Sequence, residues 1–290
     1  IFMKDVLKKG NIPTATYEVF SDAERAREFL EKCDIPIVLK ADGLAGGKGV
    51  IVAFSREEAL EGLNSLMVEQ KLGSAGDNLV IEEFLKGEEA SFIVLCDGEN
   101  VLPLASSQDH KQRDDNDMGP NTGGMGAYSP TPLITEELNE EIMREIILPT
   151  LAELKRRGID YKGFLYAGLM INEQKIKVLE YNCRFGDPET QPILMRMKSD
   201  FLDLCLKAAK QELKGEQIEW DERFALGVVM ASKGYPEKYE TGFPISGIVE
   251  ENEAIKVFHC GTKKEADEIL SNGGRVLCVT GLGSDLNSAF

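Results

Sequence analysis

The pattern of hydrophobic and polar positions predicts short strands and amphipathic helices in the first third of the chain. Apolar runs bounded by turn residues predict strands, and Ser21 with Glu24 and Ser55 with Glu58 form capping boxes that predict helix starts. The predicted strands are 13–20, 36–40, 49–54 and 79–85, and the predicted helices are 21–33 and 55–70. The second and third of these strands are too close in sequence for a parallel crossover, so we expect them to pair as a hairpin.

Further strands and helices follow along the chain. The strands are predicted to pair as 88–96 with 100–107 and as 164–171 with 175–181, and a last group lies at 225–231, 256–258 and 275–280. Thr135 is expected to cap a long helix that ends at Gly158, and helical segments continue through Leu213. A polar, glycine-rich segment from Gln108 to Pro132 is predicted to be a loop, and a loop of this length inside a domain is typically functional.

These elements predict an α+β fold and divide the chain into four parts. The parts are a lead-in helix at 1–13, a small two-layer subdomain at 14–85, a larger subdomain at 86–215 and an incomplete domain at 216–290. The chain opens at Ile1 on a predicted helix and stops at Phe290 where another helix begins. We therefore expect a piece of a longer protein.

Composition and charge narrow the classes of function. The 290 residues include 33 Lys and Arg against 50 Asp and Glu, a net charge of −17, which argues against nucleic acid as a partner. No apolar run reaches the roughly 18 residues that cross a bilayer, so we expect no membrane association and a cytoplasmic location. Six scattered cysteines without a CxxC pair, and only two histidines, indicate reduced thiols and no zinc site.

The segment from Lys40 to Gly49 is a candidate phosphate-binding loop. It holds Gly43, Gly46, Gly47 and Gly49, and lysines stand at positions 40 and 48. Glycines let backbone N–H groups close around an anion, and the lysines supply positive charge. The segment is not a Walker A motif, because neither Ser nor Thr follows Lys48. The alternative interpretation is a flexible hairpin turn.

Two acidic segments are candidates for binding a nucleoside. Glu82, Glu83, Phe84 and Leu85 lie where one predicted strand passes into the next, and backbone groups at such a junction can contact an adenine edge. The carboxylate of Glu89, a few residues later, can accept hydrogen bonds from ribose hydroxyls. The alternative interpretation is a set of solvent-facing acidic residues at a domain hinge.

The end of the strand at 175–181 carries the strongest chemical pattern. Residues two apart on a strand share a face, so Glu180, Asn182 and Arg184 point the same way if the strand extends that far. Two hard oxygen ligands together with phosphate oxygens suit Mg²⁺, and arginine holds carboxylate or phosphate by two hydrogen bonds. The alternative interpretation is a polar stripe on an edge strand.

The polar residues and glycines at 108–130 are suited to binding a sugar phosphate. Asp109, His110 and Lys111 and the run 119–130 offer an imidazole, an ammonium group, an amide, hydroxyls and many backbone N–H groups. For His110 we favour a structural, hydrogen-bonded role over that of a catalytic base. A nucleophile elbow and a Cys–His pair in motif context are both missing from the sequence, so covalent catalysis by the protein is not indicated.

Taken in order, these segments resemble the phosphoribosylamine–glycine ligase family, also called glycinamide ribonucleotide synthetase, of the ATP-grasp superfamily. The resemblance spans nearly all 290 residues and rests on IVLKADGLAGGKGVIVA, VIEEFLKGEEASFIV, SQDHK, GPNTGGMGAYSP, GFLYAGLMI, NCRFGDPETQ and LGVVMASKGYP. It implies an ATP-grasp fold, in which a small lid subdomain at 14–85 and a larger subdomain at 86–215 clamp a nucleotide. It also implies an incomplete C-terminal α+β domain at 216–290.

The resemblance implies an ATP-dependent ligase of purine biosynthesis. Glycine would be activated as glycyl phosphate and joined to 5-phosphoribosylamine, with ATP and Mg²⁺ (or Mn²⁺) as cofactors. Glu180 and Asn182 would bind the metal, and Arg184 and Lys48 would be the catalytic residues. The implied nucleotide-binding residues are Lys40, Gly46, Gly47, Lys48, Gly49, Glu82, Glu83, Phe84, Leu85 and Glu89. The implied substrate-binding residues are Asp109, His110, Lys111, Asn121, Thr122, Gly123, Gly124, Met125, Gly126, Asp187, Pro188 and Glu189.

The chain departs from the superfamily pattern on the strand before the metal residues. Many ATP-grasp enzymes carry another acidic metal ligand there, but this chain has Ala167 and Gly168. A second metal would therefore depend mainly on phosphate oxygens. Two alternatives stay open: another ATP-grasp ligase or carboxylase of purine metabolism, and a fragment that binds ATP without turnover. The sequence does not fix the oligomeric state, for which we expect a monomer.

Overall fold

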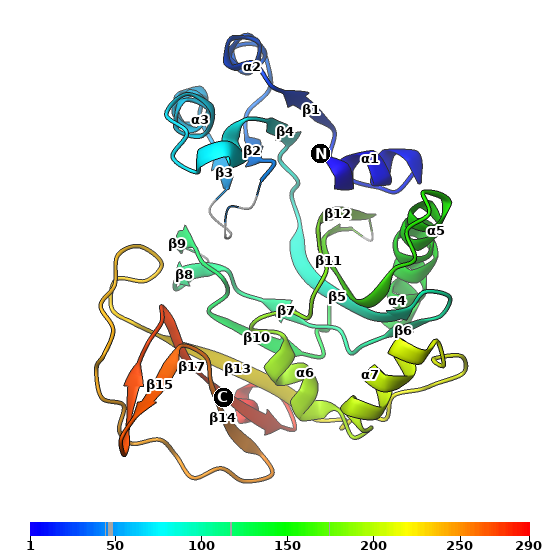
Figure 1. Cartoon of the computed structure of the whole chain (residues 1–290), viewed down its shortest axis with the longest axis vertical. Coiled ribbons are helices and arrows are strands. Elements are labelled where there is room, and N and C mark those ends of the chain that lie inside the picture. The colour runs from blue at the N-terminus through cyan, green and yellow to red at the C-terminus, as the bar shows by residue number, and fades with distance from the viewer. Residues whose placement is uncertain (44, 46–48, 117, 174) are drawn as a thin grey trace. The chain divides into compact units, whose positions relative to one another are not determined.

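The computed structural model describes residues 1–290 except 44, 46–48, 117 and 174. The chain forms two compact units, each built from several segments (Figure 1). The first unit comprises Ile1–Glu88, Met143–Glu153 and Met170–Leu179, and the second comprises Glu89–Ile142, Leu154–Leu169 and Glu180–Phe290. The four-part division of the sequence stays a prediction.

A four-stranded antiparallel sheet forms the centre of the first unit. Its order is β1 (Tyr17–Phe20), β4 (Leu79–Glu83), β2 (Ile37–Ala41) and β3 (Val50–Ala53). The predicted hairpin is confirmed, since β2 and β3 pair antiparallel from Ile37 opposite Ala53 to Lys40 opposite Val50. The hairpin brings Lys40 to the end of the sheet that leads into the glycine-rich segment.

Helices α2 (Ala23–Leu30) and α3 (Arg56–Leu63) complete the core of this sheet. Leu30 and Leu63 from the helices and Leu39 and Leu79 from the strands are fully buried together. Burial of such apolar side chains is the main stabilising contribution to a small two-layer unit. Helix α3 continues as a π-helical turn at Asn64–Val68, and a 3-10 turn follows at Gly73–Gly76.

The capping boxes predicted for these helices have different outcomes. The box at Ser55 and Glu58 is confirmed, with the Ser55 side chain accepting from the Glu58 backbone N–H. The box predicted at Ser21 is wrong, because the helix begins one residue later. Asp22 has extended backbone angles and its carboxylate accepts from the Arg25 N–H at 2.9 Å. Both residue types are good N-caps, so the sequence alone did not separate them.

Two further helical segments match their predictions. Helix α1 (Phe2–Lys9) is the lead-in helix and buries Val6 and Leu7. The long predicted helix is a run of α4 (Glu136–Ile142), a π-helical turn (Met143–Ile147) and α5 (Leu148–Arg156). The Thr135 hydroxyl accepts from the Leu138 N–H at 3.3 Å and so caps this run, as predicted.

A second four-stranded sheet contains the two other predicted hairpins. Its order is β12 (Lys175–Asn182), β11 (Lys162–Asn172), β5 (Glu88–Asp97) and β6 (Val101–Pro103). Glu180 and Asn182 both lie in β12, and Asn182 is its last residue. The tight pairing of β5 with β6 across Asp97-Gly98 confirms the turn predicted there.

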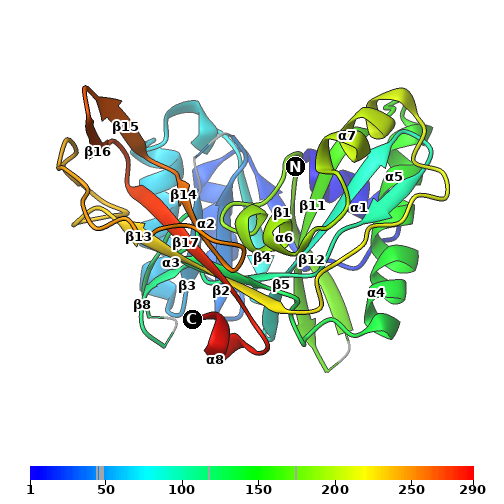
Figure 2. The same cartoon turned by 90° about the horizontal axis from the view of Figure 1, so that it is seen from below.

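A five-stranded sheet in the second unit corrects one prediction. Its order is β14 (Ile255–His259), β17 (Arg275–Gly283), β13 (Phe224–Ala231), β10 (Gly126–Ser129) and β7 (Gln108–Asp109). The strands predicted near residues 225, 256 and 275 are confirmed and lie side by side in Figure 2. The segment from Gln108 to Pro132, however, is not a loop throughout: it supplies β7 and β10 to this sheet and forms the hairpin of β8 (Gln112–Asp114) and β9 (Met118–Asn121).

The reason for this error is the long-range nature of the pairing. Strand β10 pairs antiparallel with β13, about a hundred residues later in sequence, with Gly126 opposite Val228 and Ser129 opposite Ala225. A Cβ atom at Gly126 would lie 2.7 Å from the carbonyl oxygen of Gly227, so the close approach of the two strands needs a glycine there. A short strand that contains glycine lacks the apolar alternation by which sequence patterns reveal strands.

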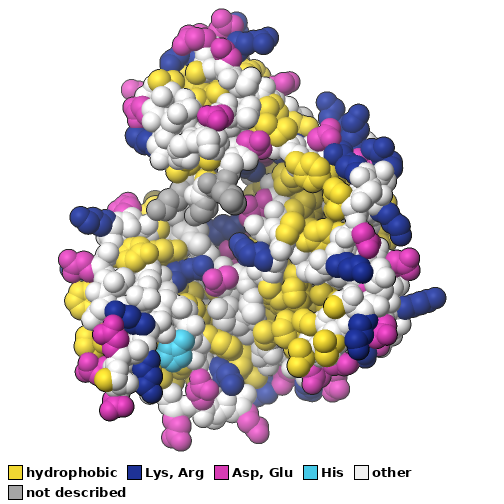
Figure 3. All heavy atoms as spheres, in the orientation of Figure 1, with side chains coloured by type: hydrophobic (Ala, Val, Ile, Leu, Met, Phe, Trp, Pro, Cys, Tyr) yellow, Lys and Arg dark blue, Asp and Glu magenta, His cyan; other side chains and the backbone are white. Residues whose placement is uncertain are grey.

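The remaining elements border these sheets. They are the hairpin of β15 (Thr262–Glu265) and β16 (Glu268–Ser271) and the helices α6 (Thr190–Arg196), α7 (Phe201–Lys210) and α8 (Leu286–Ala289). None of the helices in the described part of the chain has the length and apolarity to cross a bilayer. Acidic and basic side chains are interspersed on the face seen in Figure 3.

Candidate active site

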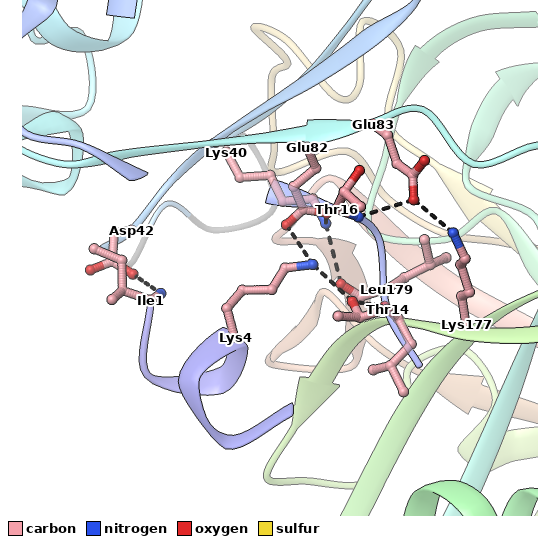
Figure 4. Close-up of polar contacts among 11 residues, drawn as sticks. Ile1, Lys4, Thr14, Thr16, Lys40, Asp42, Glu82, Glu83, Lys177 and Leu179 are labelled. Carbon is pink, nitrogen blue, oxygen red and sulfur yellow. Dashed lines mark hydrogen bonds and ion pairs between the residues drawn. The ribbon is translucent and has the colours of Figure 1, made fainter. Parts of the chain in front are cut away.

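A buried carboxylate holds two lysines in the first unit. Glu82, at the end of β4, lies 3.1 Å from the Nζ atom of Lys4 and 3.0 Å from that of Lys40. The side chains of Lys4 and Glu82 are 2% and 3% exposed, whereas that of Lys40 is 21% exposed. Figure 4 shows Lys4 reaching from α1 and Lys40 from β2 toward the same carboxylate. Lys40 is therefore the member of the group that solvent and ligands can reach.

Neighbouring oxygens complete the partners of both lysines. Lys4 Nζ donates to Thr14 Oγ1 at 2.8 Å, and that hydroxyl donates to the Val178 carbonyl at 2.7 Å. Lys40 Nζ donates to the Leu179 carbonyl at 3.2 Å. Burial lowers the pKa of Lys4 despite the attraction of Glu82, as expected for an ammonium group removed from water. The hydrogen bonds and the shared carboxylate keep this buried charge compensated.

Glu83 points to the other face of β4 and has its own partners. Lys177 Nζ lies 2.6 Å from Glu83 Oε1, which also accepts from the Thr16 N–H at 3.0 Å. Burial works to raise the pKa of Glu83, but the hydrogen bonds from Lys177 and Thr16 outweigh it and the pKa is lowered. Lys4, Lys40 and Lys177 thus outnumber the two carboxylates in this group of charges.

The structure describes the predicted nucleotide residues of the first unit only in part. Gly46, Gly47 and Lys48 lie outside the described residues. The Ala41 N–H donates to the Gly49 carbonyl at 2.8 Å, so the hairpin pairing continues to Gly49. Phe84 and Leu85 follow the end of β4, and the Phe84 ring packs against that of Phe54 at a centroid distance of 5.6 Å.

The predicted metal ligands lie at the end of β12 in the second unit. Glu180 is exposed, Asn182 is half-buried, and the Asn182 amide donates to Glu180 Oε1 at 3.3 Å. The two side chains share a face of the strand and are close enough to contact one cation. The strand ends at Asn182, so Arg184 lies beyond it, exposed, with Nη1 donating to the Phe185 carbonyl at 2.9 Å.

Gly168 accounts for the missing acidic residue on the neighbouring strand. A Cβ atom at this position would lie 3.1 Å from the Cγ atom of Glu180. The glycine therefore leaves room for the Glu180 side chain, and an acidic residue at 168 would crowd it. Within the described ranges, His, Cys, Asp and Glu side chains form no group of three or more that could hold a metal ion. A metal here would depend on Glu180, Asn182 and oxygens of a ligand.

Asp109 and Lys111 lie among several acidic side chains of the second unit. Lys111 Nζ lies 2.8 Å from Glu89 Oε2. Burial, with smaller contributions from the charges of Glu189, Glu89 and Glu180, raises the pKa of Asp109 to about 7 against the attraction of Lys111. Burial works to lower the pKa of Lys111, but Glu89 and the other carboxylates outweigh it and the pKa is raised. Residues predicted for ribose, substrate and metal thus interact electrostatically.

The segments 109–111 and 121–126 are joined by hydrogen bonds. The Lys111 carbonyl accepts from both the N–H and the hydroxyl of Thr122, at 2.7 and 2.8 Å. The His110 N–H donates to the Gly126 carbonyl at 2.9 Å, and its carbonyl accepts from the Met125 N–H at 2.8 Å. The His110 ring stacks on Tyr128 at a centroid distance of 5.9 Å. The structure therefore joins the two ends of the segment that was predicted to bind substrate.

Glu189, one of the predicted substrate residues, is a buried carboxylate. It is 2% exposed, and its Oε1 accepts from the Ser91 hydroxyl at 2.8 Å. The same hydroxyl lies 3.0 Å from the Tyr166 hydroxyl, whose pKa is raised by burial and by the charge of Glu189. Any contact of Glu189 with a substrate would use the oxygen that Ser91 leaves free, and its substrate role stays a prediction.

Arg275 and Tyr235 contact the predicted substrate loops and were not found from the sequence. Arg275 Nη1 donates to the Gly123 carbonyl at 2.7 Å, and Nη2 lies 2.8 Å from Asp187 Oδ2. The Tyr235 hydroxyl accepts from the Gly123 N–H at 3.0 Å. In the sequence, Arg275 and Tyr235 lie in an ordinary strand and an ordinary turn. Their contacts with Gly123 and Asp187 become visible only in the fold.

Two models of one protein family match consecutive parts of the chain. The family model for the ATP-grasp (A) domain of phosphoribosylglycinamide synthetase matches residues 1–190, and that for its C domain matches residues 225–290. The chain belongs to the phosphoribosylglycinamide synthetase family. The predicted α+β, ATP-grasp fold is thereby confirmed.

Curated and solved relatives agree with this family. The chain is 54% identical over 290 residues to phosphoribosylamine–glycine ligase of Vibrio vulnificus strain YJ016, covering 99% of this chain and 68% of the relative. It is 55% identical over 291 residues to the enzyme of that name from Escherichia coli K12, with the same coverage. The crystal structure of phosphoribosylamine–glycine ligase from Thermotoga maritima superposes with a TM-score of 0.89 at 36% identity, over 99% of this chain and 72% of that one.

Proposed function

We propose that the chain joins glycine to 5-phosphoribosylamine at the expense of ATP. The observation that carries this proposal is the identity of 52–56% over 99% of the chain to relatives named phosphoribosylamine–glycine ligase. In the first step a glycine carboxylate oxygen attacks the γ-phosphorus of ATP, giving glycyl phosphate and ADP. The amine of phosphoribosylamine then attacks the acyl carbon, phosphate leaves and the amine loses a proton. The product is glycinamide ribonucleotide, and the reaction is the second step of purine biosynthesis.

The charges of the first unit support a role in binding the nucleotide. Lys4, Lys40 and Lys177 face only Glu82 and Glu83 in the described cluster, so one positive charge is in excess. A phosphate group would neutralise this excess, and Lys40 is the accessible member near Glu82. In the proposed assignment, the phosphates are bound by Lys40, Lys48 and the N–H groups of Gly46, Gly47 and Gly49. Adenine is bound by Glu82, Glu83, Phe84 and Leu85. Ribose is bound by Glu89.

The end of β12 is suited to Mg²⁺ or Mn²⁺. Glu180 and Asn182 lie on one face of β12 and together carry a carboxylate and an amide oxygen, the Asn182 amide nitrogen donates to Glu180 Oε1, and Gly168 leaves space beside Glu180. These hard oxygen donors fit a divalent cation that keeps several ligand positions for phosphate and water. When bound, such a cation would neutralise negative charge on the transferred phosphoryl group. The proposal therefore assigns both residues to the metal.

The remaining predicted residues are assigned to the acceptor side of the reaction. Arg184, exposed beyond the strand end, would bind the acyl phosphate through its guanidinium. The substrate groups are Asp109 to Lys111, Asn121 to Gly126, and Asp187 to Glu189, and they would bind glycine and phosphoribosylamine. Their contribution is to hold the amine nitrogen against the acyl carbon, because positioning is the larger part of such catalysis.

The proposal is tested by substitution of Glu180. We expect Glu180→Ala to lower glycine-dependent ADP release about 100-fold or more, because loss of the metal removes several kcal/mol of charge stabilisation. The control is Glu18→Ala, which removes another exposed strand carboxylate, from β1. ADP release would be measured with glycine and with phosphoribosylamine formed in the assay from ammonia and ribose 5-phosphate. Release that depends on a different carboxylic acid, or an unchanged rate for Glu180→Ala, would contradict the proposal.

A further inference from the structure

We propose that Arg275 is a positioning residue that fixes the two acceptor loops, defined here as residues 121–126 and 187–189. The inference rests on the proposed function for its meaning in catalysis, since that function assigns both loops to glycine and phosphoribosylamine. Arg275 lies in the segment 225–290 that matches the C domain of the family. This segment would thereby set the geometry of the acceptor site as well as add a sheet to the fold.

Arg275 bonds to both acceptor loops at once. Its Nη1 donates to the carbonyls of Gly123 and Gly124 in the first loop, at 2.7 and 3.3 Å, and to that of Asp187 in the second, at 3.1 Å. Its Nη2 binds the Asp187 carboxylate at 2.8 Å. A planar guanidinium can donate in several fixed directions, whereas a lysine ammonium on its flexible stem cannot bridge the same acceptors.

The two loops also need glycine at the positions that Arg275 contacts. A Cβ atom at Gly124, where φ is +111°, would lie 2.3 Å from Pro188 Cδ, and one at Gly123 would lie 3.0 Å from the Arg275 guanidinium carbon. The loops therefore touch directly, and the guanidinium lies close to the backbone of Gly123. Glycine backbone has the largest freedom to lose, so a side chain that fixes it contributes strongly to pre-organisation of the loops.

The sheet of the second unit determines where Arg275 stands. Arg275 opens β17 and pairs with Ala231 of β13 next to a bulge, and its carbonyl accepts from the Gly261 N–H at 2.9 Å. Its side chain is 20% exposed, against 50% for Asp187, so the arginine is the better anchored partner. Tyr235, which follows β13, adds an independent contact by accepting from the Gly123 N–H at 3.0 Å.

The test compares Arg275→Gln and Arg275→Lys with a matched control. The control is Arg223→Lys, because Arg223 makes a two-point contact with Asp221 in the same unit, at 3.0 and 2.7 Å, away from the acceptor loops. Hydrogen exchange followed by mass spectrometry would report on residues 119–130 and 183–191. We expect both segments to exchange at least about tenfold faster in the Arg275 variants, and at wild-type rates in the control.

Kinetics provide the second measurement. We expect the KM for glycine and for phosphoribosylamine to rise at least about tenfold in both Arg275 variants, with the KM for ATP within about twofold of wild type. A role in stability alone would not raise the KM for glycine and phosphoribosylamine while leaving the KM for ATP unchanged. If the Arg275 variants fail to fold, Tyr235→Phe, which keeps the ring and loses the acceptor, is expected to change the same two values in the same direction.

The outcomes separate this inference from the proposed function. Unchanged exchange in both segments would overturn the positioning role, whether or not the protein is active. Faster exchange with unchanged KM values for both acceptors would overturn the link to substrate binding. Wild-type protein that releases no ADP with glycine and phosphoribosylamine would contradict the proposed function, while the exchange rates would still decide whether Arg275 fixes the loops.

Discussion

At the scale of single residues, the buried group around Glu82 shows how a predicted ligand residue also has a structural role. The sequence places Glu82 where an adenine contact is expected, but the carboxylate is 3% exposed and bound by Lys4 and Lys40. A buried charge is costly unless it is paired, so each member of such a group depends on the others. Lys4 carried no signal in the sequence, because one lysine on an amphipathic helix is most often exposed.

This dependence predicts unequal effects on stability. We expect Glu82→Ala to lower the free energy of unfolding by about 3–5 kcal/mol, because it leaves two lysines without their carboxylate. Lys4→Met should cost less, about 1–2 kcal/mol, since Glu82 keeps Lys40 and the methionine fills the same space. Lys177→Met is the control, because Lys177 is 37% exposed and its pair with Glu83 should contribute only about 0–1 kcal/mol. Urea unfolding measures all three, and an equal loss for Lys4→Met and Glu82→Ala would refute the explanation.

At the scale of elements, the turn between β5 and β6 illustrates what local sequence can specify. The Asp97 carboxylate accepts from the backbone N–H groups of Glu99 and Asn100, at 2.9 and 2.6 Å, and from that of Leu213 at 3.0 Å. Burial works to raise the pKa of Asp97, but these hydrogen bonds outweigh it and lower the pKa to about 2. The turn was predicted from Asp97-Gly98, whereas the bond to Leu213, distant in sequence, was not.

The depressed pKa of Asp97 predicts a pH-dependent loss of stability. Its folded-state pKa of about 2 lies below the ordinary value of 3.8, so its contribution is complete above about pH 4 and falls as the pH drops through 2. We expect Asp97→Ala to lower the free energy of unfolding by about 2 kcal/mol at pH 7, and the difference from wild type to shrink toward pH 2. Denaturant unfolding across this range measures it. Glu99→Ala, which keeps the backbone N–H that Asp97 binds, serves as control and should change little; a difference for Asp97→Ala that grows in acid would contradict the interpretation.

At the scale of the whole molecule, the net charge and the local charges act in opposite directions. A net charge of −17 repels an anionic nucleotide at long range, whereas lysines are in excess around Glu82. Nucleotide binding must therefore depend on a few local contacts. A ligand that binds only the folded protein stabilises the part to which it binds.

Thermal unfolding with nucleotide tests this balance. We expect MgATP at about 100 times its Kd to stabilise the folded protein by about 2.7 kcal/mol, which raises the midpoint by several degrees. Lys40→Met should lose most of this shift, because it removes the accessible ammonium group that we assign to the phosphates. Arg144→Met is the control, since the Arg144 side chain is 66% exposed and pairs with the neighbouring Glu145. A full MgATP shift in Lys40→Met, measured by scanning fluorimetry, would rule out this assignment.

The sequence alone determined the features that depend on neighbouring residues. The β2–β3 hairpin, the Ser55 capping box and the Asp97-Gly98 turn are local, because each needs only a short chain and the backbone preferences of a few residues. The family resemblance came from contiguous runs such as NCRFGDPETQ and was confirmed by the family models. The assignments of individual residues to ATP, metal and substrates came with the same runs and stay predictions.

The tertiary structure decided the features that join distant parts of the chain. Strands β7 and β10 exist because β13, about a hundred residues later than β10, pairs with it, and no local alternation marks them. Arg275 meets Gly123 and Asp187 only because β17 begins beside them, and Lys4 meets Glu82 only in the folded first unit. Contacts of this kind depend on packing between elements, which residue type and spacing do not encode locally. The sequence therefore predicted the class of reaction, and the fold determined which side chains position the predicted site residues.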